Sequence, residues 1–327
     1  MTFFVHFYQK FKQLLQEYKR PFLLSNSHFE TIYPALFRQV KNTHLPLRER
    51  IITSDGDFLD LDWYQKGSKK LLILQHGLEG SSDRPYMLGM ARAFLDKGYD
   101  VCSWNYRGCS GEMNKQPVFY HSGATYDLDT VVKKGLESYD DLTLIGFSLG
   151  GNLTLKYLGE AQRNDRIKRA VAVSVPLDLG SGADNLDTPK CFIYQKRFLN
   201  NLLRKVRIKN EIIPGFIDLN NLEKIDSIRS FDEYVTAPLH GFKGAEDYYQ
   251  QNSSKQFLKN ISVPTLILNA GNDPLLTPNI LNPNIQKSEK VEYQITKHGG
   301  HVGYARFGSN KPYWSELRAL EFCESHW

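Results

Sequence analysis

Short apolar runs alternate with longer amphipathic segments along most of this chain. The run at 71–75 is apolar up to its last residue, which is typical of a buried parallel strand, and the longer segments carry apolar residues at helical spacing. This alternation predicts an α/β fold with a mostly parallel central sheet and helices on both faces. The predicted strands are residues 50–53, 58–64, 71–75, 100–104, 142–147, 170–175, 265–270 and 291–296. Predicted helices cover residues 86–97, 127–138, the segment just after 148, and 312–325.

Two segments stand outside this alternation. In residues 1–48, apolar side chains between positions 4 and 18 recur at helical spacing, so we expect an N-terminal helix and extension that pack on the core. An alternative for this amphipathic helix is peripheral contact with a membrane or with the mouth of a substrate site. Residues 49–327 then form the main domain. Within it, residues 177–240 lack a clear strand and are rich in Lys, Arg, Asn and Leu, which predicts an inserted helical cap that contains helices near 196–206 and 219–229.

Composition narrows the class of protein. The 327 residues are 41% hydrophobic and 24% charged, which is ordinary for a soluble globular chain. A net charge of +5 without a dense Lys/Arg run argues against nucleic acid as a partner. Four scattered cysteines form no CxxC pair and indicate reduced thiols in a cytoplasmic protein. The N-terminus lacks the features of a signal peptide, no run is long enough to span a membrane, and the oligomeric state stays open.

The segment 146–150 carries the clearest chemical signal. It reads Gly-Phe-Ser-Leu-Gly, which matches G-x-S-x-G, and it follows a predicted strand and precedes a predicted helix. In that context the motif predicts a nucleophile elbow, a sharp turn that exposes the hydroxyl of Ser148 at the carboxyl edge of the sheet. Glycines at 146 and 150 avoid clashes that any Cβ would cause in such a turn. The following helix points free N–H groups at developing negative charge.

An oxyanion hole requires two hydrogen-bond donors near this serine. We expect the backbone N–H of Leu149 to be one donor and the backbone N–H of Leu78 to be the other. Leu78 lies in the turn His76-Gly77-Leu78-Glu79-Gly80, which follows the strand at 71–75 and whose glycines let the backbone approach a substrate. His76 precedes the nucleophile, in the wrong place for a base in this fold, so we interpret it as a residue that organises the loop.

The acid and the base should follow the nucleophile in the order acid, then histidine. Asp273 comes directly after the strand at 265–270 and is the expected acid, with Asp178 as the alternative. His301 follows two glycines after the last strand and is the expected base, with His298 as the alternative. The two histidines do not predict a zinc site, because a third ligand is missing nearby. Neither a metal nor a cofactor is expected.

These residues predict acyl transfer in two steps. His301 would take the proton of Ser148, and Asp273 would hold the imidazole in the required tautomer. Water, or an alcohol, would then resolve the acyl-enzyme. The expected function is hydrolysis of carboxylic esters, either short- or medium-chain acyl esters or lipids. Two alternatives stay open: an acyltransferase that makes esters from alcohols with the same triad, and a non-catalytic binding protein that kept the fold.

Over about 300 residues the chain also resembles the YheT-like branch of the α/β hydrolases, which includes the ABHD lipases and the yeast ethyl-ester acyltransferases. The resemblance implies the α/β-hydrolase fold, a Ser148–Asp273–His301 triad, and carboxylesterase or lipase-like activity. Arg107 and His121 match positions of this family. From the residues themselves, we expect both to have structural roles as hydrogen-bonding residues of their loops. The segments that carry the resemblance are 27–34, 76–82, 105–111, 121–123, 127, 146–150, 231–232, 238, 241–242, 248–249, 272–274 and 299–301.

Overall fold

An eight-stranded sheet forms the centre of the protein. The computed structural model describes residues 17–40, 45–282, 284–307 and 311–325. The strand order is β1-β2-β4-β3-β5-β6-β7-β8, in which β1–β2 and β2–β4 pair antiparallel and all other neighbours pair parallel. The strands are β1 (Leu47–Ile52), β2 (Phe58–Tyr64), β3 (Lys70–Gln75), β4 (Asp100–Asn105), β5 (Asp141–Phe147), β6 (Ile167–Val173), β7 (Thr265–Ala270) and β8 (Val291–Thr296). The mostly parallel sheet that the sequence predicts is confirmed.

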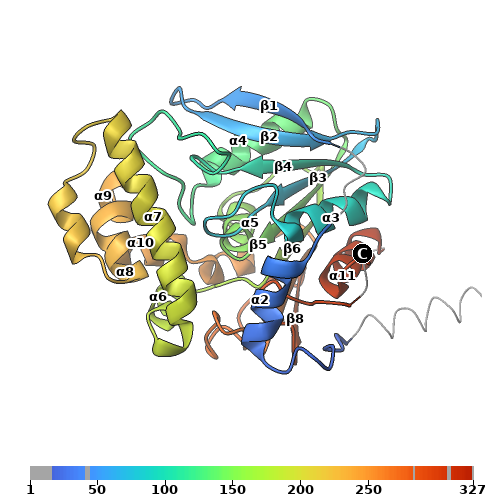
Figure 1. Ribbon diagram of the computed structural model, residues 1–327. Helices are drawn as coiled ribbons and strands as arrows, with labels where there is room; N and C mark the ends of the chain where they lie inside the picture. Colours follow the sequence, from blue (N-terminus) through green and yellow to red (C-terminus); the bar gives the residue numbers. More distant parts are fainter. Residues whose placement is uncertain (1–16, 41–44, 283, 308–310, 326–327) are drawn as a thin grey trace, which may run out of the picture.

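Helices cover both faces of this sheet (Figure 1). One apolar cluster joins α4 (Thr125–Leu136) and α5 (Leu149–Glu160) to one face, and a second joins α3 (Pro85–Leu95) and α11 (Trp314–Glu324) to the other. Both clusters contain strand residues, because successive side chains of a strand point to opposite faces. The remaining helices are α2 (Ser27–Phe37), α6 (Leu179–Leu186), α7 (Phe192–Ile212), α8 (Ile228–Phe231), α9 (Ala237–His240) and α10 (Ala245–Asn252).

The helices between β6 and β7 gather beside one end of the sheet (Figure 1). Within this insertion, α7 is a single helix of 21 residues, longer than the segment 196–206 that the sequence predicts. The predicted helix at 219–229 is wrong: a 3-10 turn at Leu219–Lys224 ends before α8 begins, since Ser227 caps α8 in a reciprocal capping box. We propose that residues 177–240 act as a cap on a domain of residues 49–327.

Several element boundaries differ from the predicted ones, among them the start of β1 and the end of β6. Strand β1 begins at Leu47, three residues before the predicted start, and Leu47 pairs with Trp63. Strand β6 ends at Val173 because the next residue, Ser174, adopts a φ of +55°, which lies outside the β region.

The predicted N-terminal helix at residues 4–18 lies almost wholly outside the described residues. Tyr18 is described and buried; its hydroxyl donates to the carbonyl of Ala305 at 3.0 Å. Its ring packs against the rings of Tyr304 and Trp314. We propose that residues 1–48 form an extension on the main domain. In the part of the chain that the structure describes, no helix is long and apolar enough to cross a membrane.

Candidate active site

Ser148 lies in a strained turn between β5 and α5. Its φ is +53°, in the left-handed region that residues other than glycine rarely adopt. A Cβ at position 146 would lie 2.1 Å from the carbonyl oxygen of Gly150, and a Cβ at position 150 would lie 2.6 Å from that of His76. Both contacts are with backbone and cannot be relieved by rotating a side chain. The turn therefore requires glycine on both sides of the serine, and it exposes the serine at the end of β5.

A hydrogen-bonded chain joins Ser148, His301 and Asp273. The Oγ of Ser148 lies 3.0 Å from Nε2 of His301, and Nδ1 of the same ring lies 2.8 Å from Oδ2 of Asp273. A carboxylate can only accept, so Nδ1 carries the ring proton and Nε2 is free to accept from the serine hydroxyl. The Asp273 side chain is completely buried, and its Oδ1 accepts from the backbone N–H of Leu275 at 2.9 Å. The three residues predicted from the sequence as nucleophile, base and acid thus meet in one place.

Helix α2 supports the loop that carries His301. The Oγ1 of Thr31 accepts from the backbone N–H of His301 at 2.9 Å. Glu30 is buried and accepts a hydrogen bond from the side chain of Asn272, whose Oδ1 in turn accepts from the N–H of Gly300 at 3.2 Å. Burial raises the pKa of Glu30 above its usual value, against the opposing effect of the Asn272 hydrogen bond. Sequence reasoning missed these supports; their only signals were the family-like segments 27–34 and 272–274.

The alternative acid and base lie elsewhere. Asp178 caps α6 by accepting from the N–H of Ser181 at 3.1 Å, and its other oxygen pairs with Lys255. Within the described residues, Nδ1 of His298 has no hydrogen-bond partner, and burial lowers the pKa of this ring. Neither side chain contacts Ser148 or His301 through any described hydrogen bond.

His76 organises the loop beside the serine. It is fully buried; its Nδ1 lies 2.8 Å from the carbonyl of Gly77, and its Nε2 accepts from the N–H of Tyr106 at 3.2 Å. Burial lowers the pKa of His76 to about 3, so its imidazole is neutral at pH 7. The expectation of a loop-organising residue agrees with these contacts.

The two expected oxyanion donors lie beside Ser148. The turn 77–80 is closed by a 3.0 Å hydrogen bond from the N–H of Gly80 to the carbonyl of Gly77. A Cβ at position 77 would lie 3.2 Å from Cβ of Ser148, so this turn lies directly against Ser148. Leu149 is the first residue of α5, where a backbone N–H has no partner within the helix. Leu78 and Leu149 line the same cavity as Ser148.

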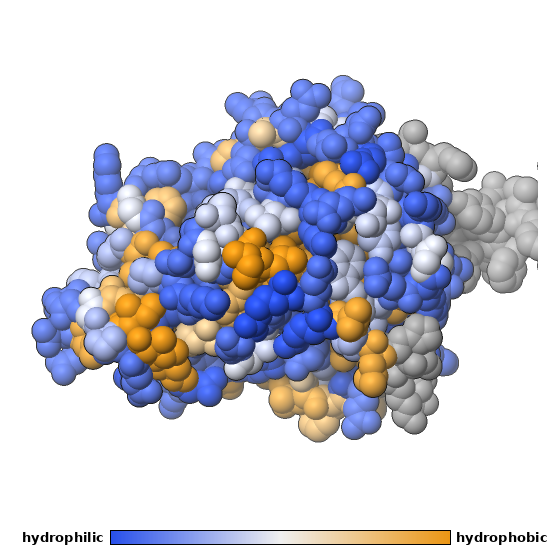
Figure 2. All heavy atoms as spheres, turned by 90° about the horizontal axis from the view of Figure 1, so that it is seen from above, coloured by the Kyte–Doolittle hydropathy of each residue, from blue (hydrophilic) through white to orange (hydrophobic). Residues whose placement is uncertain are grey.

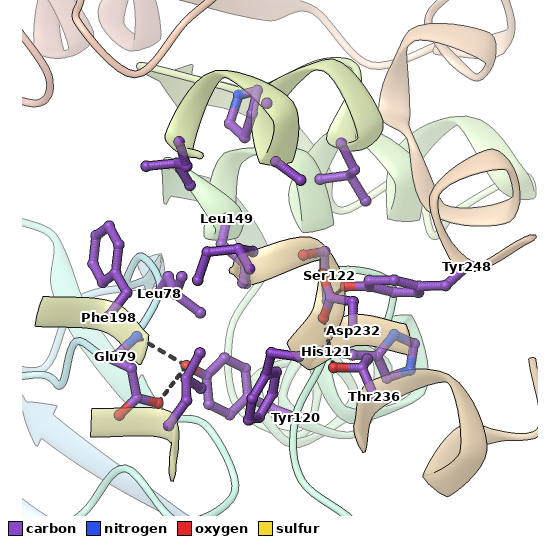
Figure 3. Close-up of a pocket in the computed structure, with 18 of the residues that line it drawn as sticks. Leu78, Glu79, Tyr120, His121, Ser122, Leu149, Phe198, Asp232, Thr236 and Tyr248 are labelled. Carbon is purple, nitrogen blue, oxygen red and sulfur yellow. Dashed lines mark hydrogen bonds between the residues drawn. The ribbon is translucent and has the colours of Figure 1, made fainter. Parts of the chain in front are cut away.

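A mainly apolar cavity extends from Ser148 under the insertion. Figure 3 shows Glu79 on one side of this cavity, hydrogen-bonded to Tyr120, and His121 with Asp232 on the opposite side. We call it the cap cavity. Its apolar lining consists of Leu78, Phe119, Leu149, Pro176, Leu179, Ala183, Leu186, Phe198, Leu202, Ile228, Phe231, Val235, Leu239, Leu275 and Leu276.

A second cavity reaches the same serine from the side of α2. It lies between α2 and α7 and is lined by Ser148 and His301 together with residues of both helices, among them Leu36 and Ile193. We call it the α2–α7 cavity. Leu36 and Ile193 are both exposed, so the cavity opens at the surface between apolar side chains. The face of the molecule in Figure 2 is mostly hydrophilic, with hydrophobic residues in separate patches.

Arg107 and His121 differ in their relation to this site. Arg107 is buried and pairs with Asp127 at 2.7 Å, with Asp55 at 2.6 Å and with Asp57 at 3.1 Å. These ion pairs join the loop after β4 to α4 through Asp127 and to the β1–β2 turn through Asp55 and Asp57. That is a structural role. His121, by contrast, lines the cap cavity, although its Nδ1 also accepts from the N–H of Gly123 at 3.2 Å.

Comparison with known proteins identifies the family. A sequence profile described as the alpha/beta hydrolase fold matches residues 70–305. The chain belongs to the α/β-hydrolase fold family. The Escherichia coli protein YheT, which is named as an esterase, is 36% identical over 289 residues, which cover 86% of this α/β hydrolase and 84% of YheT. The resemblance to the YheT-like branch is thereby confirmed, and the chain is a hydrolase.

More distant relatives share most of its length. The monoacylglycerol lipase of Saccharomyces cerevisiae is 30% identical over 297 residues, which cover 88% of this α/β hydrolase and 65% of the lipase. Phospholipase ABHD3 of Bos taurus is 29% identical over 270 residues, 78% of this chain and 66% of the relative. Among solved structures, an esterase of Pyrococcus furiosus superposes with a TM-score of 0.56 at 18% identity, covering 87% of this chain and 96% of that one. This last likeness confirms the fold.

Proposed function

We propose that this protein is a serine carboxylesterase that forms an acyl-enzyme on Ser148. The observation that carries the proposal is the hydrogen-bonded chain from Ser148 through His301 to Asp273, at one end of an apolar cavity. The esterase and lipase names of the relatives point to the same reaction class.

Acylation follows from this geometry. Nε2 of His301 takes the proton of the Ser148 hydroxyl as Oγ attacks the ester carbonyl carbon. The negative charge that develops on the carbonyl oxygen is stabilised by the backbone N–H groups of Leu78 and Leu149, each contributing roughly 3–4 kcal/mol to lowering the barrier. The protonated imidazole is stabilised by the Asp273 carboxylate and gives its proton to the leaving alcohol. Water then attacks the acyl group on Ser148 with the same ring as base, which restores the free enzyme.

The lining of the two cavities indicates the substrate class. Both are dominated by apolar side chains and both reach Ser148, so the acyl chain can occupy one and the alcohol part the other. We infer that the substrates are short- or medium-chain acyl esters or lipids. The named activities of the yeast lipase and of phospholipase ABHD3 support acyl esters of this kind.

Transfer of the acyl group to an alcohol is the second candidate reaction. The specific observation in its favour is that two separate cavities meet at Ser148, so that an alcohol can enter beside a bound acyl group. Adding ethanol to an assay separates the reactions, because transfer diverts acyl groups to ethyl esters whereas hydrolysis yields only the free acid.

The test of the proposed function is hydrolysis of p-nitrophenyl esters of increasing chain length by the wild-type protein and by Ser148→Ala. We expect the variant to stay folded and to lose at least about 10³-fold in kcat, since removal of the nucleophile of a serine hydrolase costs on the order of 10⁶-fold. A fluorophosphonate probe should label the wild-type protein at Ser148 and leave the variant unlabelled. Unchanged turnover in Ser148→Ala would refute the proposal, and failure of the probe to label the wild-type protein would favour a non-catalytic binding role.

A further inference from the structure

Glu79 adopts a backbone conformation that few residues other than glycine accept. It follows Leu78 in the turn 77–80, and its φ is +54°. A positive φ at the third position of a hydrogen-bonded turn normally selects glycine. A glutamate keeps this conformation only where surrounding contacts hold it in place. The contacts of Glu79 therefore determine the shape of the turn that presents the Leu78 N–H.

Tyr120 and Lys205 supply these contacts. The Tyr120 hydroxyl accepts from the backbone N–H of Glu79 at 2.8 Å and donates to Oε1 of the same residue at 2.8 Å. Nζ of Lys205 donates to that Oε1 at 2.9 Å. The side chains of Glu79 and Lys205 are only 4% and 14% exposed, so this ion pair is largely shielded from water. A shielded pair is sensitive to the loss of one partner, because the other charge is then left buried.

The two charges come from different parts of the fold. Glu79 follows β3, whereas Lys205 lies in the middle of α7, in the insertion that covers the cap cavity. Nζ of Lys205 also donates to Sγ of Cys109 at 3.1 Å and lies 5.6 Å from the centre of the Tyr120 ring. Burial raises the pKa of the Cys109 thiol to about 11, so this thiol is neutral and the Glu79 carboxylate is the anion that balances Lys205.

We propose that Lys205 is a positioning residue that acts through Glu79. Because Lys205 belongs to α7 and holds Glu79, the geometry of the Leu78 oxyanion donor depends on how α7 packs over the site. The inference rests on the proposed esterase function and extends it to the control of that site. When α7 is seated, the ammonium group holds Glu79 in its left-handed conformation, and the turn presents the Leu78 N–H to the carbonyl oxygen. Without the ammonium group, the turn can relax and the donor moves away from the oxyanion position.

Lys209 offers a matched control one helical turn further along α7. It is fully buried, whereas Lys205 is partly buried. Its Nζ donates to Oδ1 of Asn114 at 2.6 Å and to the carbonyls of Gln116 and Val118 at 2.6 Å and 2.8 Å. These partners belong to the segment before α4 and not to the turn 77–80. Replacing either lysine by methionine removes a shielded charge from the same helix, but only Lys205→Met removes the contact with Glu79.

The experiment compares kcat and KM for p-nitrophenyl ester hydrolysis in wild type, Lys205→Met, Glu79→Gln, the double variant and Lys209→Met, with thermal unfolding of each. We expect kcat to fall about 10- to 100-fold in Lys205→Met with KM within about threefold, since loss of an entire oxyanion donor costs about 10²- to 10³-fold. The double variant should be no slower than the slower single variant, because both substitutions remove the same contact. Lys209→Met should keep kcat within about twofold of wild type.

Two results would overturn the inference. One is a kcat for Lys205→Met within twofold of wild type; the other is an equal fall in kcat for Lys209→Met, which would show that general loosening of α7 is responsible. Ser148→Ala separates the two proposals: if it is inactive while Lys205→Met is fully active, only the positioning role fails.

Discussion

Nδ1 of His301 lies 2.8 Å from Oδ2 of Asp273, across 28 residues of sequence, while Nε2 of the same ring lies 3.0 Å from Oγ of Ser148. The ring is thus held between an acceptor and a hydroxyl donor. This arrangement distinguishes His301 and Asp273 from the other histidines and carboxylates near the carboxyl edge of the sheet.

The two histidines of the loop after β8 should differ sharply in their effect on activity. We expect His301→Ala to lower kcat for ester hydrolysis by at least 10³-fold, because Ser148 loses its general base. His298→Ala should keep kcat within about threefold, since the His298 ring forms no described hydrogen bond to the triad. Steady-state kinetics with a p-nitrophenyl ester measures both. A larger loss in His298→Ala than in His301→Ala would contradict the assigned base.

The same comparison applies to the two candidate acids. Asp273→Asn should lower kcat by about 10⁴-fold, since an amide favours the wrong imidazole tautomer for proton transfer from Ser148. Asp178→Asn should leave kcat nearly unchanged and reduce stability by at most about 1 kcal/mol, because asparagine can still cap α6 and only the ion pair with Lys255 is lost. Kinetics and urea unfolding of the two variants give the measurement, and comparable kinetic losses in both would count against Asp273.

Thr31 should contribute to catalysis by positioning the backbone of His301. We expect Thr31→Val to lower kcat about fivefold, which corresponds to the ~1 kcal/mol of one hydrogen bond, with little change in KM. Thr130→Val is a matched control: both threonines donate to the carbonyl four residues earlier in their helices, but only Thr31 accepts from His301. Equal kinetics in the two variants would exclude this role of α2.

The carboxyl of Asp232 should make stability depend on pH. Burial raises the pKa of Asp232 to about 6, although hydrogen bonds from Thr236 and Tyr249 oppose this shift. Since the pKa is higher in the folded than in the unfolded chain, the folded state binds more protons between about pH 4 and pH 6, and stability falls as pH rises through that range.

Asp232→Asn should remove this effect. We expect the difference in the free energy of unfolding, wild type minus variant, to decrease by on the order of 2 kcal/mol as the pH rises from 4 to 7. Thermal or urea unfolding at several pH values provides the measurement, and Asp165→Asn, at an exposed position, should reproduce the wild-type profile. A constant difference between wild type and Asp232→Asn at all pH values would show that the carboxyl does not titrate in this range.

The sequence by itself determined the sheet, the turn at 146–150 and the identity of the three residues that meet there. Two of these features follow from local rules, which are the period of apolar residues and the steric need for glycine at 146 and 150. The third follows from the fold class: parallel strands end at one edge of the sheet, so the residues after β5, β7 and β8 lie together. The order of acid and histidine along the chain then selected Asp273 and His301.

Only the tertiary structure decided what holds the site in place. The contacts of Thr31 with the backbone of His301 and of Lys205 with Glu79 join residues 270 and 126 positions apart, and no local pattern of hydrophobic and polar positions contains either pairing. The insertion was also the least predictable part, because its helix boundaries depend on caps such as Ser227 and on packing over the cavity more than on periodicity. Local sequence determines which elements form and which groups reach the sheet edge, whereas the positions of those groups depend on long-range contacts that exist only once the chain has packed.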